Sequence, residues 1–183
     1  MRFLCLVLAS LLVVGCAPNF AVSPHFDMSK TYTLGVLPPT AASELDSTDL
    51  GGLYDYANMT LMQTGHFSVL ERSRIDAILK EQTFGASGLT NPSSAISVGK
   101  LLQADAIALT NVISVKPDSF FAAQGNRNAY DVELFVKILS CTTGEILYSS
   151  QGQGTGQNGR LEALQMALSQ AIYGITHNKG GHQ

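Results

Sequence analysis

The chain has 183 residues, of which 45% are hydrophobic and 14% charged, and its 11 lysine and arginine residues stand against 14 acidic residues. This length predicts one domain with a core of its own, and the composition excludes a disordered chain. A formal net charge of −3 leaves no basic surplus to neutralise phosphates, so nucleic acid is not an expected partner.

The first residues of the chain predict an export signal. Residues 1–15 carry one basic side chain followed by a run over residues 3–14 that is apolar apart from Ser10. Such a run is too short for a membrane span, which needs about 20 apolar residues, and fits a secretory signal peptide. The run ends in the letters VVGC at residues 13–16, the pattern of a bacterial lipobox, which predicts a lipid on Cys16. A plain signal peptide, or a buried apolar segment that ends in cysteine, is the alternative interpretation.

The residue after the lipobox cysteine predicts where the anchor goes. Ala17 follows Cys16, and the absence of aspartate at this position favours the outer membrane over retention in the inner membrane. We therefore expect a protein anchored by acyl chains on the periplasmic side of the outer membrane, with no transmembrane helix. Cys5 leaves with the signal peptide, so Cys141 is the one cysteine of the folded part, and we expect it half-buried near the end of a strand.

The first half of the mature chain predicts a β-α-β unit followed by two helices. Residues 16–30 contain two prolines and no periodicity, which predicts a tether between lipid and domain. The domain is expected over residues 31–178, and its helices are recognised by apolar residues at i, i+3 and i+4. In chain order we expect a strand at 31–37, a helix at 49–64 capped by Asp49, a strand at 67–70, a helix at 73–82, a loop at 84–90 and a helix at 93–103.

The second half predicts an antiparallel meander closed by a helix. Apolar residues alternate with polar ones over residues 129–140, as in a half-buried strand, and Gly144 suits a tight hairpin turn. In chain order we expect a strand at 104–115, a loop at 116–128, strands at 129–140 and 146–151, a polar glycine-rich connector at 152–159, a helix at 161–176 and a flexible tail at 179–183. The expected fold class is α/β (α+β): a single domain with a mixed sheet in the order β-α-β-α-α-β-β-β-α.

Three segments of the chain resemble parts of one known family. Residues 67–82 (FSVLERSRIDAILKEQ) resemble the strand-to-helix segment F-x-V-V-E-R…L…L-x-E of the CsgG family, the curli-secretion lipoproteins. Residues 101–108 (LLQADAIA) are similar to its L-G-A-D-x-I entry into a strand, and residues 143–147 (TGEIL) to its D-x-x-T-G-E-I-L hairpin. With the lipobox, these segments cover most of the mature chain in the order of the family.

The resemblance implies an anticodon-binding-domain-like α/β fold in the periplasm, as in LpoB, the lipoprotein activator of a penicillin-binding protein, and in flagellar lipoproteins of the FlgO type. Pore-forming CsgG proteins carry two long insertions that become membrane hairpins, and each spanning strand needs about 9–11 alternating residues. Neither residues 116–128 nor residues 151–160 show such alternation. The acidic residue that the family places before the hairpin turn is also replaced, by Ser140-Cys141. We therefore expect the soluble domain of the family without its channel.

Several patterns that could carry chemistry have simpler structural explanations. Residues 154–159 spell G-x-G-x-x-G, but the parallel strand and acidic residue of a dinucleotide site do not follow, so we expect a flexible connector. Glu71-Arg72 is expected to be a salt bridge or cap at a helix start, and Met59 and Met62 are expected in the core. We expect no enzyme, no cofactor and no metal site, although His177 and His182 could bind adventitious metal.

One aromatic pair is the candidate contact site. Phe120 and Phe121 are adjacent in the expected loop, and two neighbouring aromatic residues cannot both point into a core from a loop. We therefore expect at least one of them at a tip that contacts a partner or the membrane.

The predicted function is that of an outer-membrane lipoprotein acting as an accessory or scaffold in the assembly or export of a cell-surface structure, with a protein partner in the envelope. Homo-oligomerisation is left open, as is the alternative of an LpoB-like or FlgO-like lipoprotein supporting a cell-wall synthase or the flagellum. A true secretion channel is the third and weakest interpretation.

Overall fold

The computed structural model describes residues 19–42, 45–81 and 91–177. The strands in these ranges are β1 (Phe20–Val22), β2 (Tyr32–Val36), β3 (Thr40–Ala41), β4 (Phe67–Val69), β5 (Ala106–Pro117), β6 (Tyr130–Ser140) and β7 (Ile146–Gly156). The helices are α2 (Ser47–Gln63), α3 (Arg72–Glu81), α4 (Pro92–Leu102), α5 (Ser119–Ala123) and α6 (Arg160–His177).

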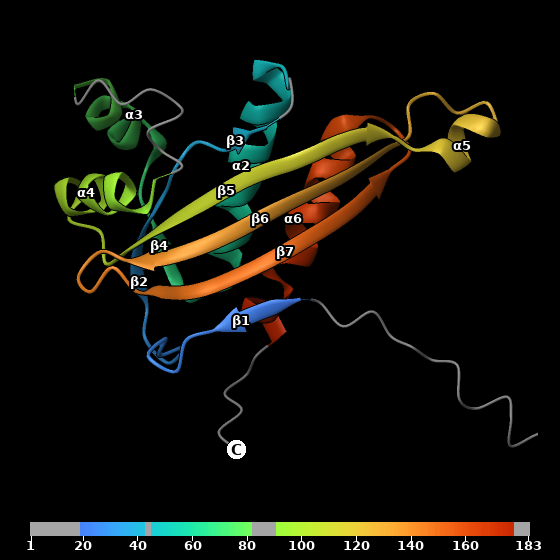
Figure 1. Ribbon diagram of the computed structural model, residues 1–183. Helices are drawn as coiled ribbons and strands as arrows, with labels where there is room; N and C mark the ends of the chain where they lie inside the picture. Colours follow the sequence, from blue (N-terminus) through green and yellow to red (C-terminus); the bar gives the residue numbers. More distant parts are fainter. Residues whose placement is uncertain (1–18, 43–44, 82–90, 178–183) are drawn as a thin grey trace, which may run out of the picture.

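One mixed sheet organises the domain (Figure 1), in the strand order β1-β7-β6-β5-β2-β4, with β3 alongside β5. Strand β2 is parallel to both β4 and β5, while β5, β6 and β7 form an antiparallel meander. The predicted fold class and the predicted β-α-β unit joined to a meander are therefore confirmed. The turn between β6 and β7 depends on Gly144, whose φ of 76° lies in the left-handed region that glycine tolerates.

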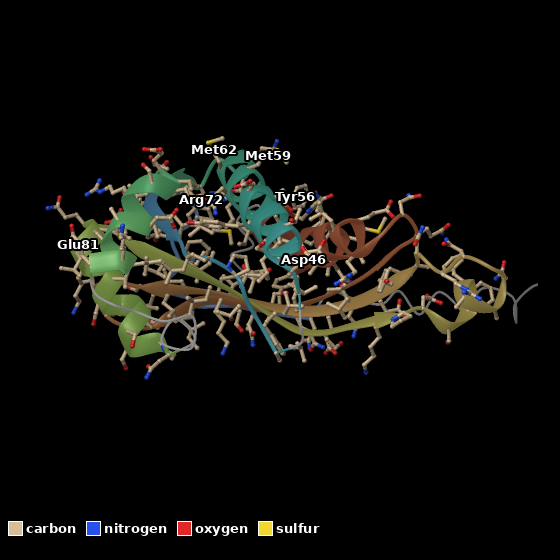
Figure 2. All side chains as sticks on the ribbon, turned by 90° about the horizontal axis from the view of Figure 1, so that it is seen from above. Asp46, Tyr56, Met59, Met62, Arg72 and Glu81 are labelled. Carbon is tan, nitrogen blue, oxygen red and sulfur yellow. The ribbon has the colours of Figure 1, made fainter. Side chains whose placement is uncertain are left out.

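Helices cover the two faces of the sheet unequally. Helices α2 and α6 pack on one face, against the inward residues of all three meander strands, and Figure 2 shows both helices on the same side of the sheet. Helices α3 and α4 cover only one end of the other face, through Ile75, Val98 and Leu102 against Leu37 and Ile107. The remainder of that second face is left without a helix in the part that the structure describes.

Helix α2 begins earlier than the sequence predicted. Asp46 is its N-cap, because the Asp46 carboxylate accepts a hydrogen bond of 2.8 Å from the main-chain N–H of Asp49. The prediction that Asp49 caps this helix is therefore wrong by one turn. Asp49 lies in the first turn instead, where it forms an ion pair of 3.6 Å with Arg160 at the start of α6.

Helix α6 lies directly against the main chain of β7. Gly152, Gly154 and Gly156 face it on alternate residues of the strand, and Ala163 and Ala167 face them from the helix. A Cβ atom at Gly154 would stand 2.4 Å from the main-chain nitrogen of Ala167 and 2.6 Å from the carbonyl oxygen of Ala163. The prediction of a flexible connector at residues 152–159 is wrong for this reason: glycine here makes room for a helix, and the strand continues to Gly156.

Two other segments that were predicted to be irregular are ordered elements. The predicted loop at 116–128 contains the end of β5 and the short helix α5, which Asp118 caps by accepting hydrogen bonds from the N–H groups of Phe120 and Phe121 at 2.7 and 3.0 Å. The tether predicted over residues 16–30 is wrong for its described part. Strand β1 pairs antiparallel with β7, and Phe26 is buried in the core.

We predict that Gly154→Ala lowers the free energy of unfolding by at least about 2 kcal/mol, because the new methyl group meets rigid main chain that cannot give way. The matched control is Gly51→Ala in α2, where a Cβ atom would meet nothing within 4 Å and alanine is the better helix former. Urea unfolding of both variants checks the prediction. Equal stabilities would contradict the close packing of α6 on β7.

Candidate functional site

The described N-terminal segment is fastened to the β6–β7 turn by one carboxylate. Glu145 accepts a hydrogen bond of 2.6 Å from the Ser23 hydroxyl and lies 2.9 Å from Nδ1 of His25. The hydrogen bond from Ser23, followed by that from His25, holds the pKa of Glu145 below its usual value. Phe26 then packs on Phe67, with ring centroids 6.0 Å apart. We call residues 20–26 the strap.

The strap is also held at its N-terminal end. The ring of Phe20 lies over Gly174 of α6, where a Cβ atom would approach the ring to 2.7 Å, and it stacks on Tyr148 at a centroid distance of 6.2 Å. The N–H of Gln151 donates to the carbonyl of Asn19, which extends the pairing with β7 by one residue. The strap therefore fixes the place and direction in which the chain leaves the domain toward Cys16.

Helix α5 forms an aromatic tip at the end of β5. Phe120 is 67% exposed, Phe121 is half-buried, and their rings meet edge to face with centroids 5.4 Å apart. The sequence predicted that at least one of these two aromatic residues is exposed, and Phe120 is. The two residues lie on a short helix, whereas the sequence predicted a loop. Two-thirds of the Phe120 surface is exposed, so the ring is available for a contact.

A second candidate surface lies between α2 and the start of α3. Met59 and Met62 are 42% and 58% exposed and point away from the sheet (Figure 2), so the prediction that they belong to the core is wrong. With Val69 and Leu70 they line a hollow of about 340 Å³. Helical periodicity explains the error, because the buried residues of α2, such as Leu53 and Ala57, lie on the opposite side of the helix. Flexible thioether side chains on a surface suit contacts with another protein.

Arg72 organises the rim of this hollow. Its guanidinium forms ion pairs with Asp55 at 3.1 Å and with Asp76 at 3.5 Å, and it lies 4.6 Å from the ring centre of Tyr54. The sequence predicted a pair between Glu71 and Arg72, but these acidic partners come from α2 and α3 instead. Glu71 is exposed and also lines the hollow, so the rim carries the two carboxylates of Asp55 and Glu71 and one guanidinium.

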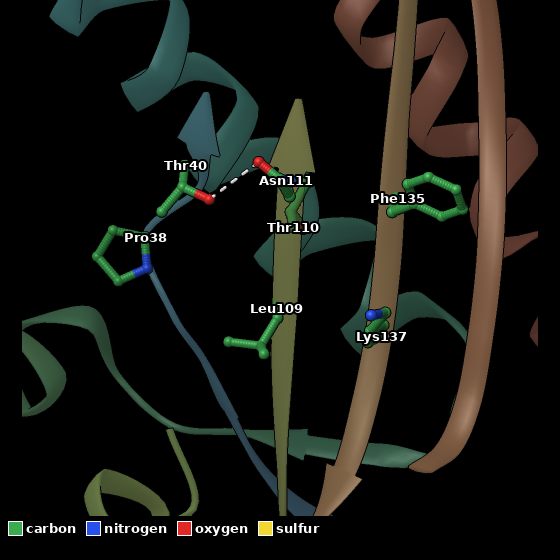
Figure 3. A pocket seen from close by; sticks show the side chains of 7 residues that line it. All are labelled: Pro38, Thr40, Leu109, Thr110, Asn111, Phe135 and Lys137. Atoms are coloured by element: carbon green, nitrogen blue, oxygen red, sulfur yellow. Dashed lines mark hydrogen bonds between the residues drawn. The ribbon is translucent and has the colours of Figure 1, made fainter. Parts of the chain in front are cut away.

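A smaller hollow lies on the uncovered face of the sheet (Figure 3). It has a volume of about 160 Å³ and is lined by residues of β5 and β6, among them Leu109, Phe135 and Lys137. The hydroxyl of Thr40 donates to the side-chain oxygen of Asn111 across its upper part, at 3.2 Å. Sites for small molecules usually measure about 300–1,000 Å³, so this hollow is too small to hold a cofactor.

The remaining candidate residues do not form a reactive site in the described ranges. Cys141 is buried beside Gly99, and burial raises the pKa of its thiol to about 11, so it stays a protonated thiol at neutral pH. The ring of His177 stacks on Tyr173 at 3.8 Å, and His182 lies outside the described residues. Among residues 19–42, 45–81 and 91–177 no three potential ligands lie close enough together to hold a metal ion.

The predicted lipid site, Cys16, and the predicted signal peptide, residues 1–15, lie outside the described residues. No helix in the described part of the chain has the length and apolarity of a membrane span.

Comparison with known proteins places this arrangement in a recognised group. A family model described as "Curli production assembly/transport component CsgG" matches residues 18–177. No curated protein matches the chain.

Solved structures share the fold at low identity. The PelC dodecamer from Paraburkholderia phytofirmans is 11% identical, with a TM-score of 0.57 over 88% of this chain and 97% of that chain. Lipoprotein GNA1162 from Neisseria meningitidis is 15% identical, with a TM-score of 0.54 over 81% of this chain and 99% of that chain. The NMR structure of E. coli LpoB is 17% identical, with a TM-score of 0.52 over 70% of this chain and 58% of that chain.

We predict that the strap loosens in acid. Because the pKa of Glu145 is lowered in the folded state, its stabilising contribution is complete above the usual value of 4.5 and is lost as the pH falls through the folded-state pKa. Hydrogen-exchange protection of residues 20–26 should therefore drop below pH 4.5 in the natural protein, and should already be low at pH 7 in Glu145→Gln. Glu162→Gln is the control, since that carboxylate also has a lowered pKa but bonds Asn158 at the start of α6. A strap that stays protected in Glu145→Gln would contradict the clamp.

Proposed function

The chain belongs to the family of the curli production assembly/transport component CsgG, and from this membership we propose that it is an accessory or scaffold lipoprotein in the assembly or export of a cell-surface structure, without forming the channel itself. The observation that carries the proposal is the match over residues 18–177 together with what occupies the two positions where the pore-forming members carry membrane hairpins. The proposal includes no catalytic step.

Neither of those positions holds a segment suited to span a membrane. The first holds α5, a helix of five residues, with its short connections. The second holds the glycine end of β7, which is packed against the main chain of α6. A spanning strand needs about 9–11 residues with one apolar, lipid-facing side. These two features support a soluble accessory domain over a channel subunit.

The lipid anchor is part of the proposal. We place the signal peptide at residues 1–15, the lipid on Cys16 and the domain on the periplasmic side of the outer membrane. The position of the strap supports this arrangement, because it leads the chain out of the domain close to Cys16. Two residues, Ala17 and Pro18, separate Asn19 from Cys16, and the three Cα-to-Cα steps between them can span at most about 11 Å.

The protein contact belongs, in this proposal, to the hollow between α2 and α3. Its two exposed methionines offer adaptable apolar surface, and the excess of acidic side chains on its rim favours a partner with basic residues. A homo-oligomer is a further part of the proposal, and the dodecameric state of PelC supports it. The tip at Phe120 and Phe121 is the other proposed contact.

The alternative is a lipoprotein of the LpoB or FlgO type that supports a cell-wall synthase or the flagellum. The shared fold with LpoB favours it, although this chain spans only 58% of the E. coli protein. The short connection to Cys16 argues against it, because a domain held within about 11 Å of its anchor meets only partners that come to its own membrane.

We predict that Cys16→Ser leaves the domain folded but moves it from the membrane fraction to the soluble fraction, because the acyl chains are lost. Fractionation of cells and circular dichroism of the variant check this. Cys141→Ser is the matched control, since the Cys141 thiol lies in the core and carries no anchor. Recovery of Cys16→Ser in the membrane fraction would contradict the anchor.

We also predict that the purified lipidated protein, reconstituted into planar lipid bilayers, produces no stepwise ionic current. The expectation follows from what occupies the two hairpin positions, the five-residue helix α5 and the end of β7 packed on α6, neither of which is suited to line a channel. Reproducible unit conductances would show a pore and overturn the accessory role, even if the lipid anchor were present.

A further inference from the structure

We propose that helix α5 is a second membrane contact, which enters the same leaflet as the acyl chains on Cys16 and sets the sheet with its strands steep to the membrane surface. The inference rests on the proposed lipid anchor and adds an orientation to it. Four features of the described residues carry it: the direction of β1, the reach of the chain, the exposure of the tip and its charge.

The direction of β1 points the anchor toward α5. Strand β1 is antiparallel to β7, with Phe20 opposite Ser150 and Val22 opposite Tyr148. Going from Val22 back toward Asn19 therefore follows β7 toward its C-terminal end at Gly156. Gly156 pairs with Tyr130, and Tyr130 pairs with Pro117, the last residue of β5 before α5. The chain thus leaves the domain toward the end of the sheet that carries the tip (Figure 1).

The reach of the chain then limits how far the membrane can be from the tip. Asn19 lies level with Gln151, and the five residue steps from Gln151 to Gly156 cover about 17 Å of strand. The three residue steps from Asn19 to Cys16 cover at most about 11 Å. With the strands steep to the membrane, the lipidated residue therefore stops short of the end of the sheet, while α5 lies beyond that end. The tip must then enter the headgroup layer.

The tip has the surface chemistry of an interfacial segment. Phe120 projects into solvent, and the neighbouring Ala122 and Ala123 are exposed and apolar. The carboxylate of Asp118 is turned inward to cap α5, so the nearest exposed charges along the chain on either side of the aromatic pair are those of Lys116 and Arg127. Exposed Asp131 lies opposite Lys116 in the sheet, so the attraction to anionic headgroups rests on Arg127, beside the shallow apolar insertion.

The competing orientation lays the β1 edge of the sheet flat on the membrane. Two aromatic side chains lie near that edge. Tyr173 of α6 is 43% exposed, and the Tyr173 ring stacks on His177. Phe20 of β1 packs on Gly174. The aromatic side chains at that edge are less exposed, at 37% for Phe20 and 43% for Tyr173, than Phe120 at 67%. The tip is the better candidate for lipid.

Single tryptophans distinguish these orientations, because the natural chain contains none. We would place tryptophan at the tip (Phe120→Trp), at the β1 edge (Tyr173→Trp) and, as a control, on the exposed side of α2 (Met62→Trp). Each lipidated full-length variant is reconstituted into vesicles of phosphatidylethanolamine and phosphatidylglycerol that contain lipids brominated near the top of the acyl chain. An interfacial side chain lies about 5–10 Å into the boundary layer, so Phe120→Trp should lose at least about half of its emission while the other two keep theirs.

Each other outcome overturns a defined part of the scheme. Quenching of Tyr173→Trp with an unquenched Phe120→Trp would show the flat orientation and sink the inference. If the protein binds the vesicles but no tryptophan is quenched, the lipid anchor stands and the membrane contact of α5 is wrong. The tip would then face solvent or a protein partner. Protein of unlipidated mass that fails to float with the vesicles would overturn the proposed anchor, and the orientation with it.

Discussion

The direct contact of α6 with the main chain of β7 decides how the domain is built. Three glycines on the strand and three alanines on the helix bring the two elements together without intervening side chains, and the hydroxyl of Tyr148 adds a hydrogen bond of 2.6 Å to the carbonyl of Ala171. The helix therefore packs directly on the C-terminal part of β7, where these glycines lie. It also presents Gly174 to Phe20, so that the strap closes over the same helix. The position of the N-terminal exit thus depends on the packing of the last helix.

The sequence was most informative where long periodic segments had one buried face. In β6, the alternation of residues 130–138 predicts the strand, its inward face and its neighbours in the meander, because a period of two leaves little ambiguity. The short elements were missed for physical reasons. Three residues in β1 and five in α5 are too few to show a period, and the cap at Asp118 is one signal among many polar loop residues. In residues 152–156, low strand propensity concealed a strand whose glycines are required by its partner helix.

The candidate surfaces illustrate a second limit. The exposure of the Phe120 tip follows from simple reasoning about adjacent aromatics, whereas the hollow beside Met59 and Met62 was misassigned because methionine on an amphipathic helix usually faces a core. The ion pair between Arg72 and Asp55 could not be predicted from the sequence either. Asp55 lies on a different helix, seventeen positions earlier, and the two side chains come together only in the folded domain. The two surfaces lie on different elements of the fold. Helix α5 follows the C-terminal end of β5, whereas the hollow lies between α2 and α3 at β4, which is an edge strand of the sheet.

The attachment of the strap has a mechanical consequence. A force that pulls on the N-terminal side of Asn19 acts along β1. Because β1 is antiparallel to β7, the hydrogen bonds between the two strands bear this force together, in shear. The packing of Phe20 on Gly174 also resists the movement. Behind this ladder, Glu145 holds Ser23 and the buried ring of Phe26 resists extraction. Tension between the membrane and a bound partner would therefore pass into the main sheet through these contacts in turn. The domain would transmit force with little extension, because the chain between the domain and its lipid is very short.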